Sequence, residues 1–212
     1  MKPMMTLALP ALLLATTAQA QTSTAPTAAA QISGNPAAAP AGTYELDGRH
    51  ASVIARISHL GASLSVFRFD KIAGKLDWLP ANPSQSKVSV EIQTASVTSN
   101  VPGFADELTK APWLNTAKYP VATFTSTAIR TTGASAGVIS GNLTLMGVTK
   151  PIQITARLFG AGKNTRGTAV VGFSGNTRFK RSDFGFKTGL PMIGDEIELL
   201  LDVEFLAQSA AR

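Results

Sequence analysis

Polar and apolar residues alternate along most of the chain after residue 43. Between residues 51 and 59, Val53, Ala55 and Ile57 share one face, and His59 continues it. The same alternation recurs in four later stretches, at residues 87–94, 141–145, 151–158 and 196–205. Because successive side chains of a strand point to opposite faces, each stretch predicts a strand with one buried and one wet face. That character is typical of antiparallel sheets.

Turn-forming residues separate the predicted strands. Gly61 ends the first, and glycine-containing segments at 132–137 and 146–150 mark two hairpins. We therefore expect eight strands, at about residues 44–59, 63–79 (bent), 86–96, 121–130, 136–146, 150–159, 167–180 and 193–206. A short helix is expected at 104–110, in the connection around residues 103–118.

Eight antiparallel strands can close into a barrel or pack as a sandwich of two sheets. A closed barrel removes the exposed edges that invite aggregation, and eight strands leave room for one small ligand. The residues on the predicted inward faces are nearly all aliphatic. A cavity between them would therefore suit an apolar ligand, although the alternation alone does not decide between barrel and sandwich.

The N-terminal part of the chain does not follow this alternation. Lys2, an apolar run from 4 to 15 and an Ala-x-Ala ending at Ala20 are the three parts of a secretory signal peptide, with cleavage expected after Ala20. The run is about a dozen residues, too short to cross a bilayer, so no integral membrane span is expected. Residues 21–42 are uncharged and rich in Ala, Pro and Thr, which predicts a flexible tether. The domain is then 43–208.

Composition and charge narrow the classes of function. The chain has no cysteine, which excludes a disulfide scaffold, a thiolate metal site and a cysteine nucleophile. Its 19 Lys and Arg against 13 Asp and Glu give a formal charge of +6. The densest basic segment holds Arg178, Lys180, Arg181 and Lys187. It is either a solvated rim or a mouth that meets an anionic lipid head group. Nucleic acid is not an expected partner, because the chain carries an export signal and no nucleic-acid-binding motif.

The sequence makes no positive case for catalysis, a metal or a cofactor. Its two histidines, His50 and His59, lie nine residues apart, or roughly 30 Å along a straight strand, and cannot share one ion. There is no Gly-x-Ser-x-Gly turn and no phosphate-binding glycine loop. His59 is either a strand-end residue bonded to backbone or a polar contact for a ligand.

Four motifs, in order, resemble the YceI-like family of bacterial polyisoprenoid-binding proteins. They are His50–Ser63, Trp113-Leu114 with Lys118–Thr127, Gly141–Pro151, and Arg181–Gly185 followed by Ile193–Leu199. The resemblance extends over about residues 43–206, essentially the whole predicted domain. It implies an all-β, eight-stranded antiparallel lipocalin-like barrel with a long internal pocket.

The resemblance also implies a function. Such proteins are periplasmic or secreted, bind long isoprenoid chains or isoprenoid quinone-type lipids, and act as carriers or storage proteins, sometimes linked to stress, rather than as enzymes. A homodimer is compatible with the family. Two other hypotheses remain open: an accessory protein or enzyme acting on a quinone-type lipid, and a barrel filled by side chains that serves in protein interactions.

The inward positions and the resemblance together predict which residues bind the ligand. They are Val53, Ala55, Ile57, His59, Phe67, Val90, Ile92, Phe124, Leu143, Leu145, Ile154, Phe173, Arg181, Phe184, Ile197 and Leu199. The alternative for the apolar ones is ordinary core packing. Asp183 is expected to stabilise the bend that follows Arg181. Phe67 stands where many family members have glycine, and Ala55 where a large aromatic is common, so the two departures would reshape the pocket.

Overall fold

The computed structural model describes residues 29–208 and is almost entirely β-structure. The strands are β1 (Gln31–Ser33), β2 (Gly42–Leu46), β3 (Ser52–His59), β4 (Ser63–Phe69), β5 (Ile72–Trp78), β6 (Lys87–Gln93), β7 (Val97–Ser99), β8 (Val121–Gly133), β9 (Ala136–Leu145), β10 (Val148–Lys163), β11 (Ala169–Lys180) and β12 (Ile193–Ala207). The α-helix found in this part of the chain is α1 (Phe104–Thr109). Five short 3-10 turns are η1 (Pro36–Ala38), η2 (Gly48–His50), η3 (Pro83–Gln85), η4 (Thr94–Ser96) and η5 (Arg181–Phe184).

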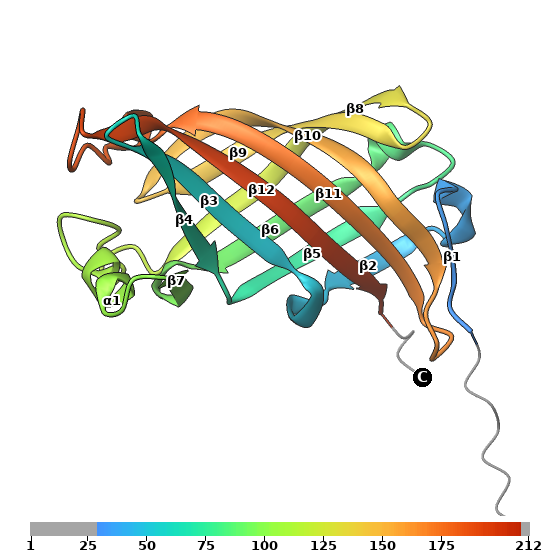
Figure 1. Cartoon of the computed structure of the whole chain (residues 1–212). Coiled ribbons are helices and arrows are strands. Elements are labelled where there is room, and N and C mark those ends of the chain that lie inside the picture. Colours follow the sequence, from blue (N-terminus) through green and yellow to red (C-terminus); the bar gives the residue numbers. More distant parts are fainter. Residues whose placement is uncertain (1–28, 209–212) are drawn as a thin grey trace, which may run out of the picture.

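The sheet closes through β11, which pairs with β10 on one side and β12 on the other. The circuit runs β10-β9-β8-β6-β5-β2-β12-β11 and returns to β10, with every pairing antiparallel. Figure 1 shows the resulting elongated barrel, with α1 and β1 at opposite ends. The eight-stranded barrel with a short helix in its long connection is therefore confirmed, and the sandwich is excluded.

Two of the eight predicted strands are each divided into two pieces. The first becomes β2 and β3, separated by η2, where the Asp47 side chain accepts a hydrogen bond from the Arg49 N–H. The second becomes β4 and β5, whereas the third ends at Gln93 as β6, and the short strand β7 follows it after η4. The long strand β12 pairs with both parts of the first, using 193–202 for β3 and 205–207 for β2. As a result, β3, β4 and β7 pair in order beyond β12 and form an extension of the sheet, which we call the flap, at one end of the barrel.

Residues 100–120 cover the gap that this flap leaves beside β8. β7 pairs with β4, whereas β8 pairs with β6, so β7 and β8 are not neighbours in the sheet. Thr94 fastens the covering segment, because its hydroxyl donates to the Tyr119 carbonyl at 2.6 Å and its N–H donates to the Pro120 carbonyl at 2.9 Å. α1 thus lies over the end of the barrel rather than against its outer wall (Figure 1).

The segment before the barrel is partly regular. Residues 31–33 form β1, which pairs with β10, and Ala39 is fully buried. This differs from the flexible tether expected over 21–42, because the extended chain finds unpaired backbone groups on β10 and hydrogen-bonds to them. The predicted signal peptide and the start of the tether lie outside the described residues. No helix within 29–208 is long and apolar enough to cross a membrane.

Buried residues gather at the ends and in the walls of the barrel rather than at one central point. At the β1 end, Tyr44, Trp78, Val171 and Phe205 pack together. At the other end, a second cluster includes Leu108 of α1 with Val97, Leu114 and Phe186. The interior between these clusters is hollow, as the next subsection describes.

Gly141 offers a test of how tightly the wall is packed. A Cβ atom at this position would collide with the Phe124 ring on β8 and lie 2.5 Å from the Thr125 carbonyl oxygen. We expect Gly141→Ala to lower the free energy of unfolding by about 1–3 kcal/mol, measured by urea unfolding. Gly133→Ala is the matched control, because a Cβ there meets nothing within 4 Å. Equal stability of the two variants would contradict the tight β8–β9 packing.

Candidate ligand-binding cavity

The barrel interior holds two adjoining chambers. Chamber one, of about 200 Å³, lies toward the β1 end, and chamber two, of about 560 Å³, lies toward α1. Val53, Ile92, Leu143 and Leu199 line both, and we call these four residues the waist. Chamber two falls within the size range of typical small-molecule sites. The shared walls make the pair a candidate for one elongated ligand.

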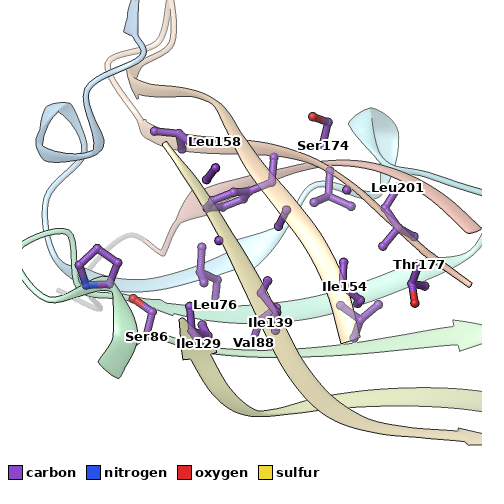
Figure 2. Close-up of a pocket in the computed structure, with 18 of the residues that line it drawn as sticks. Leu76, Ser86, Val88, Ile129, Ile139, Ile154, Leu158, Ser174, Thr177 and Leu201 are labelled. Carbon is purple, nitrogen blue, oxygen red and sulfur yellow. The ribbon is translucent and has the colours of Figure 1, made fainter. Parts of the chain in front are cut away.

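Chamber one has an apolar wall that carries no charged side chain. Figure 2 shows Leu76, Val88, Ile129, Ile139 and Ile154 reaching toward a common interior from different strands. Its polar side chains are neutral hydroxyls, among them those of Ser86, Ser174 and Thr177 (Figure 2). This follows from the alternation of the strands, which directs their charged residues to the outside.

Chamber two is closed toward α1 by a chain of aromatic rings. Phe67 on β4 lies 6.1 Å from Phe104, which lies 6.2 Å from Trp113, which lies 6.2 Å from Phe186, all measured between ring centroids. The Thr188 hydroxyl donates to the Pro112 carbonyl at 2.7 Å and ties the loop after η5 to the segment around α1. These contacts bring three distant parts of the chain together over the chamber.

The structure places fifteen of the sixteen predicted ligand-binding residues on the chamber walls. Besides the waist, chamber one takes Val90, Phe124, Ile154 and Phe173, and chamber two takes Ala55, Ile57, His59, Phe67, Leu145, Arg181 and Ile197. The exception is Phe184, which is fully buried with its ring 5.2 Å from that of Phe179. Phe184 therefore packs behind the wall. Contact of the other fifteen with a ligand stays a prediction.

The two departures from the family pattern face each other. Ala55 on β3 and Phe67 on β4 are direct partners in the antiparallel register, and both line chamber two. Side chains of such partners are about 4.5–5.5 Å apart at Cβ. The small residue therefore lies beside the large one in the wall of chamber two.

Arg181 is the most deeply buried charged residue of the described chain, with no exposed surface. Its guanidinium donates four hydrogen bonds, to the carbonyls of Gly194 (2.8 Å), Phe186 (3.1 Å), Thr188 (2.8 Å) and Ile193 (2.9 Å). It also lies 4.9 Å from the centre of the Phe186 ring. Burial lowers the pKa of Arg181, and the charge of Asp195 opposes that effect. The arginine nevertheless stays protonated at neutral pH.

The geometry gives Arg181 a positioning role. Two of its acceptors, Phe186 and Thr188, belong to the loop between η5 and β12, and the other two, Ile193 and Gly194, begin β12, so one side chain fastens the loop to the start of that strand. The bend after Arg181 is stabilised by Asp195, whose carboxylate accepts from the Ser182 N–H (2.9 Å) and hydroxyl (2.7 Å). Burial acts to raise the pKa of Asp195, but these hydrogen bonds and the charges of Arg181 and Lys180 outweigh it and lower the pKa. The expected role of Asp183 thus falls to Asp195, because no hydrogen bond of the exposed Asp183 side chain is found among the described residues.

The other basic residues of the segment face outward. Arg178 is paired with Glu198 at 2.8 Å and with Glu196 at 3.6 Å on the barrel surface. Lys180 and Lys187 are exposed. The solvated-rim interpretation therefore fits these three residues, whereas Arg181 points inward.

One group of metal-ligating residues occurs in the described chain, near η2. The ligand atoms of Asp47, His50 and Glu204 lie within 4.8 Å of one another. The Arg49 guanidinium already donates to both oxygens of Asp47, at 3.0 and 2.8 Å, and lowers the pKa of this carboxyl well below its usual range. A cation there would compete with Arg49, so the group is better described as an ion pair. His59 lies at the other end of β3, in the wall of chamber two.

Sequence reasoning missed part of the cavity wall. Leu76, Trp78 and Phe205 share the inward face of predicted strands, and the alternation could have found them. Phe104 and Trp113 lie in the irregular segment 100–120 and carry no periodic signal. Their position depends on contacts made far away in the chain, with Phe67 and Phe186.

Comparison with known proteins places these features in a family. The model of the YceI-like domain matches residues 44–205. A UPF0312 protein of Shewanella baltica is 43% identical over 171 residues, which cover 80% of this chain and 90% of that protein.

Solved structures are similar in fold. The YceI protein of Campylobacter jejuni is 31% identical, with a TM-score of 0.65 over 72% of this chain and 90% of that chain. A domain from Saccharophagus degradans described as polyisoprenoid-binding is 17% identical, with a TM-score of 0.60 over 78% of this chain and 98% of that chain. At this identity the second similarity shows the fold alone.

Arg181 provides a prediction about the loop that it holds. Arg181→Met removes the donor from four buried carbonyls, and leaving buried acceptors unpaired costs about 1–3 kcal/mol each. We expect a loss of at least about 3 kcal/mol in the free energy of unfolding, measured with urea. Arg178→Met, which removes only the surface ion pairs with Glu196 and Glu198, should cost less than about 1 kcal/mol. Similar small losses for both variants would refute the positioning role.

Proposed function

Because this chain belongs to the YceI-like family, we propose that its barrel binds one long-chain lipid of the isoprenoid type and shields it from water. The observation that carries the proposal is the pair of apolar chambers that adjoin at the waist inside a closed sheet. The polyisoprenoid-binding description of the Saccharophagus degradans domain, which shares the fold, supports the same ligand class.

The proposed mechanism is sequestration. Each methylene group moved out of water contributes about 0.8 kcal/mol, so a long apolar tail gains much from entering the barrel. Chamber one is lined by aliphatic, aromatic and hydroxyl side chains, which suits the tail. Chamber two adds His59, Ser65 and Thr94, which suit a polar end group such as a quinone ring or an alcohol. We therefore infer that the tail points toward β1 and the polar end toward α1.

Binding rather than catalysis is proposed. The walls consist almost wholly of apolar side chains, and Arg181, the one charged residue among them, is fully engaged with backbone carbonyls. An enzyme acting on a quinone-type lipid would have to rely on His59. Lipid recovered chemically changed after incubation with the protein would favour that alternative. A hollow interior supports a carrier over a barrel filled by its own side chains.

We also propose that the protein is exported and works in the periplasm, as a carrier or store for the lipid. The three-part pattern of residues 1–20 supports export. The absence of cysteine is compatible with an oxidising compartment.

The waist provides a test of lipid binding and of tail length. Ile92→Trp places a large ring where the chambers meet, so binding of a polyprenyl lipid should weaken at least tenfold, as measured by native mass spectrometry and titration. Glu91→Trp is the matched control, because the neighbouring residue of β6 is exposed and lies on the opposite face. A short isoprenoid that fits within one chamber should still bind the Ile92 variant.

Native mass spectra of wild-type protein purified from its own organism form the second half of this test. We expect a bound lipid that can be extracted into organic solvent, and the same spectra show whether the chain is a homodimer. Empty protein that takes up no added isoprenoid would refute the proposed function.

Export is tested separately by intact mass. Protein recovered from a periplasmic extract should begin at Gln21, after loss of the first twenty residues. Ala20→Arg should leave the precursor uncleaved, because the small residue before the cleavage site is lost. Recovery of the uncleaved wild-type chain in the cytoplasm would contradict export.

A further inference from the structure

The segment from Gln31 to Ala39 runs across the β1 end of the barrel, and we call it the N-terminal strap. It consists of β1, a turn, η1 and the buried Ala39. It lies before the region matched by the family model, which starts at residue 44. Figure 1 shows it beside the end of β10, opposite α1.

Two glycines of β10 make a seat for the strap. A Cβ atom on Gly160 would lie 2.5 Å from the Ile32 Cγ2 atom. A Cβ atom on Gly162 would collide with the Gln31 carbonyl oxygen and lie 3.2 Å from the Ile32 Cα atom. Gly162 therefore needs glycine, both for the close approach of the β1 backbone and for its φ of +150°, whereas a larger residue at Gly160 would push the Ile32 side chain aside. The small residues Gly160, Ala161 and Gly162 therefore allow β1 of the same chain to approach β10 closely.

After β1, the strap continues into the end of the barrel. Pro36 of η1 lines chamber one, together with Pro83 of η3 and residues 133–137 of the β8–β9 hairpin. Ala39 has no exposed surface and packs in the cluster that contains Tyr44 and Trp78. The strap thus contributes Pro36 to the wall of chamber one at the β1 end of the barrel.

The strap is held weakly compared with the strands of the barrel. β1 pairs with β10 over three residues, all of them exposed, whereas β10 itself has 16 residues. Ile32 is 48% exposed, and residues 31–39 include no charged side chain that could form an ion pair. Short segments with few buried contacts open at low free-energy cost.

We propose that the N-terminal strap is a gate on chamber one, seated on Gly160 and Gly162, whose release opens the β1 end of the cavity to ligand. The identity of the cargo rests on the proposed function, but the gate itself rests on the strap's seat and on Pro36. Docked, the strap slows exchange of a ligand already inside. Released, it withdraws Pro36 from the wall and leaves the β1 end of chamber one less covered.

A reversible disulfide tests the gate directly. Gln31 and Lys163 are cross-strand partners, both are exposed, and the chain contains no other cysteine that could interfere. In the Gln31→Cys/Lys163→Cys variant, oxidation locks the strap and reduction frees it. The probe is N-phenyl-1-naphthylamine, an uncharged apolar dye, and the readout is its uptake rate by stopped-flow fluorescence. We expect uptake at least tenfold slower in the oxidised form, with an unchanged amplitude at equilibrium.

A second variant works in the opposite direction. Gly160→Ala introduces the collision with Ile32 and should speed dye uptake several-fold. It should also speed amide hydrogen exchange in residues 31–39 and 161–163. Gly172→Ala is the matched control, since Gly172 is the partner of Gly160 on β11 and a Cβ there meets nothing closer than 3.8 Å.

The outcomes separate the gate from the proposed function. Equal uptake rates for oxidised and reduced protein, with the disulfide verified by mass, would overturn the gate while leaving lipid binding intact. Failure of every variant to bind dye or isoprenoid would count against the proposed function. The gate would then be judged by hydrogen exchange, and equal exchange in the Gly160 and Gly172 variants would overturn it.

Discussion

Closure of the sheet through β11 is the constraint on which the rest of this structure depends. Each barrel strand finds hydrogen-bonding partners on both sides, so the wall can be lined by apolar side chains without leaving its backbone polar groups unpaired. The interior does not need to be filled to hold the strands together. Buried residues form clusters at the two ends, around Tyr44 and Leu108, and further clusters in the wall, such as that of Phe124 and Leu143.

Much of the fold follows from a period of two along the chain, because a closed sheet with one wet face requires it. The period identified eight strands and part of the cavity wall, including Val53, Ile92 and Leu199. It could not show that the first strand divides at Asp47, because the division depends on how β12 pairs with two segments in turn. Nor could it place Arg181, whose carbonyl partners are set by the path of a loop. Aperiodic residues such as Trp113 are positioned by tertiary contacts that local sequence does not encode.

The two chambers differ in ways that matter for a ligand with unlike ends. Chamber one has an uncharged wall, whereas chamber two includes Arg181 and is covered toward α1 by a chain of aromatic rings. The direct pairing of Ala55 with Phe67 puts a small side chain of β3 beside a large ring of β4 in the wall of chamber two.

The seat of β1 on β10 also concerns the solubility of the protein. Beyond Arg157, β10 has left its partner β9 behind, and β1 covers the edge at residues 161–163. Uncovered strand edges are templates for pairing with other chains. Removing the first forty residues to make a shorter protein would expose this edge, with two glycines that admit a foreign backbone closely. β1 therefore protects this edge of β10, and a protein that lacks β1 is expected to self-associate more readily.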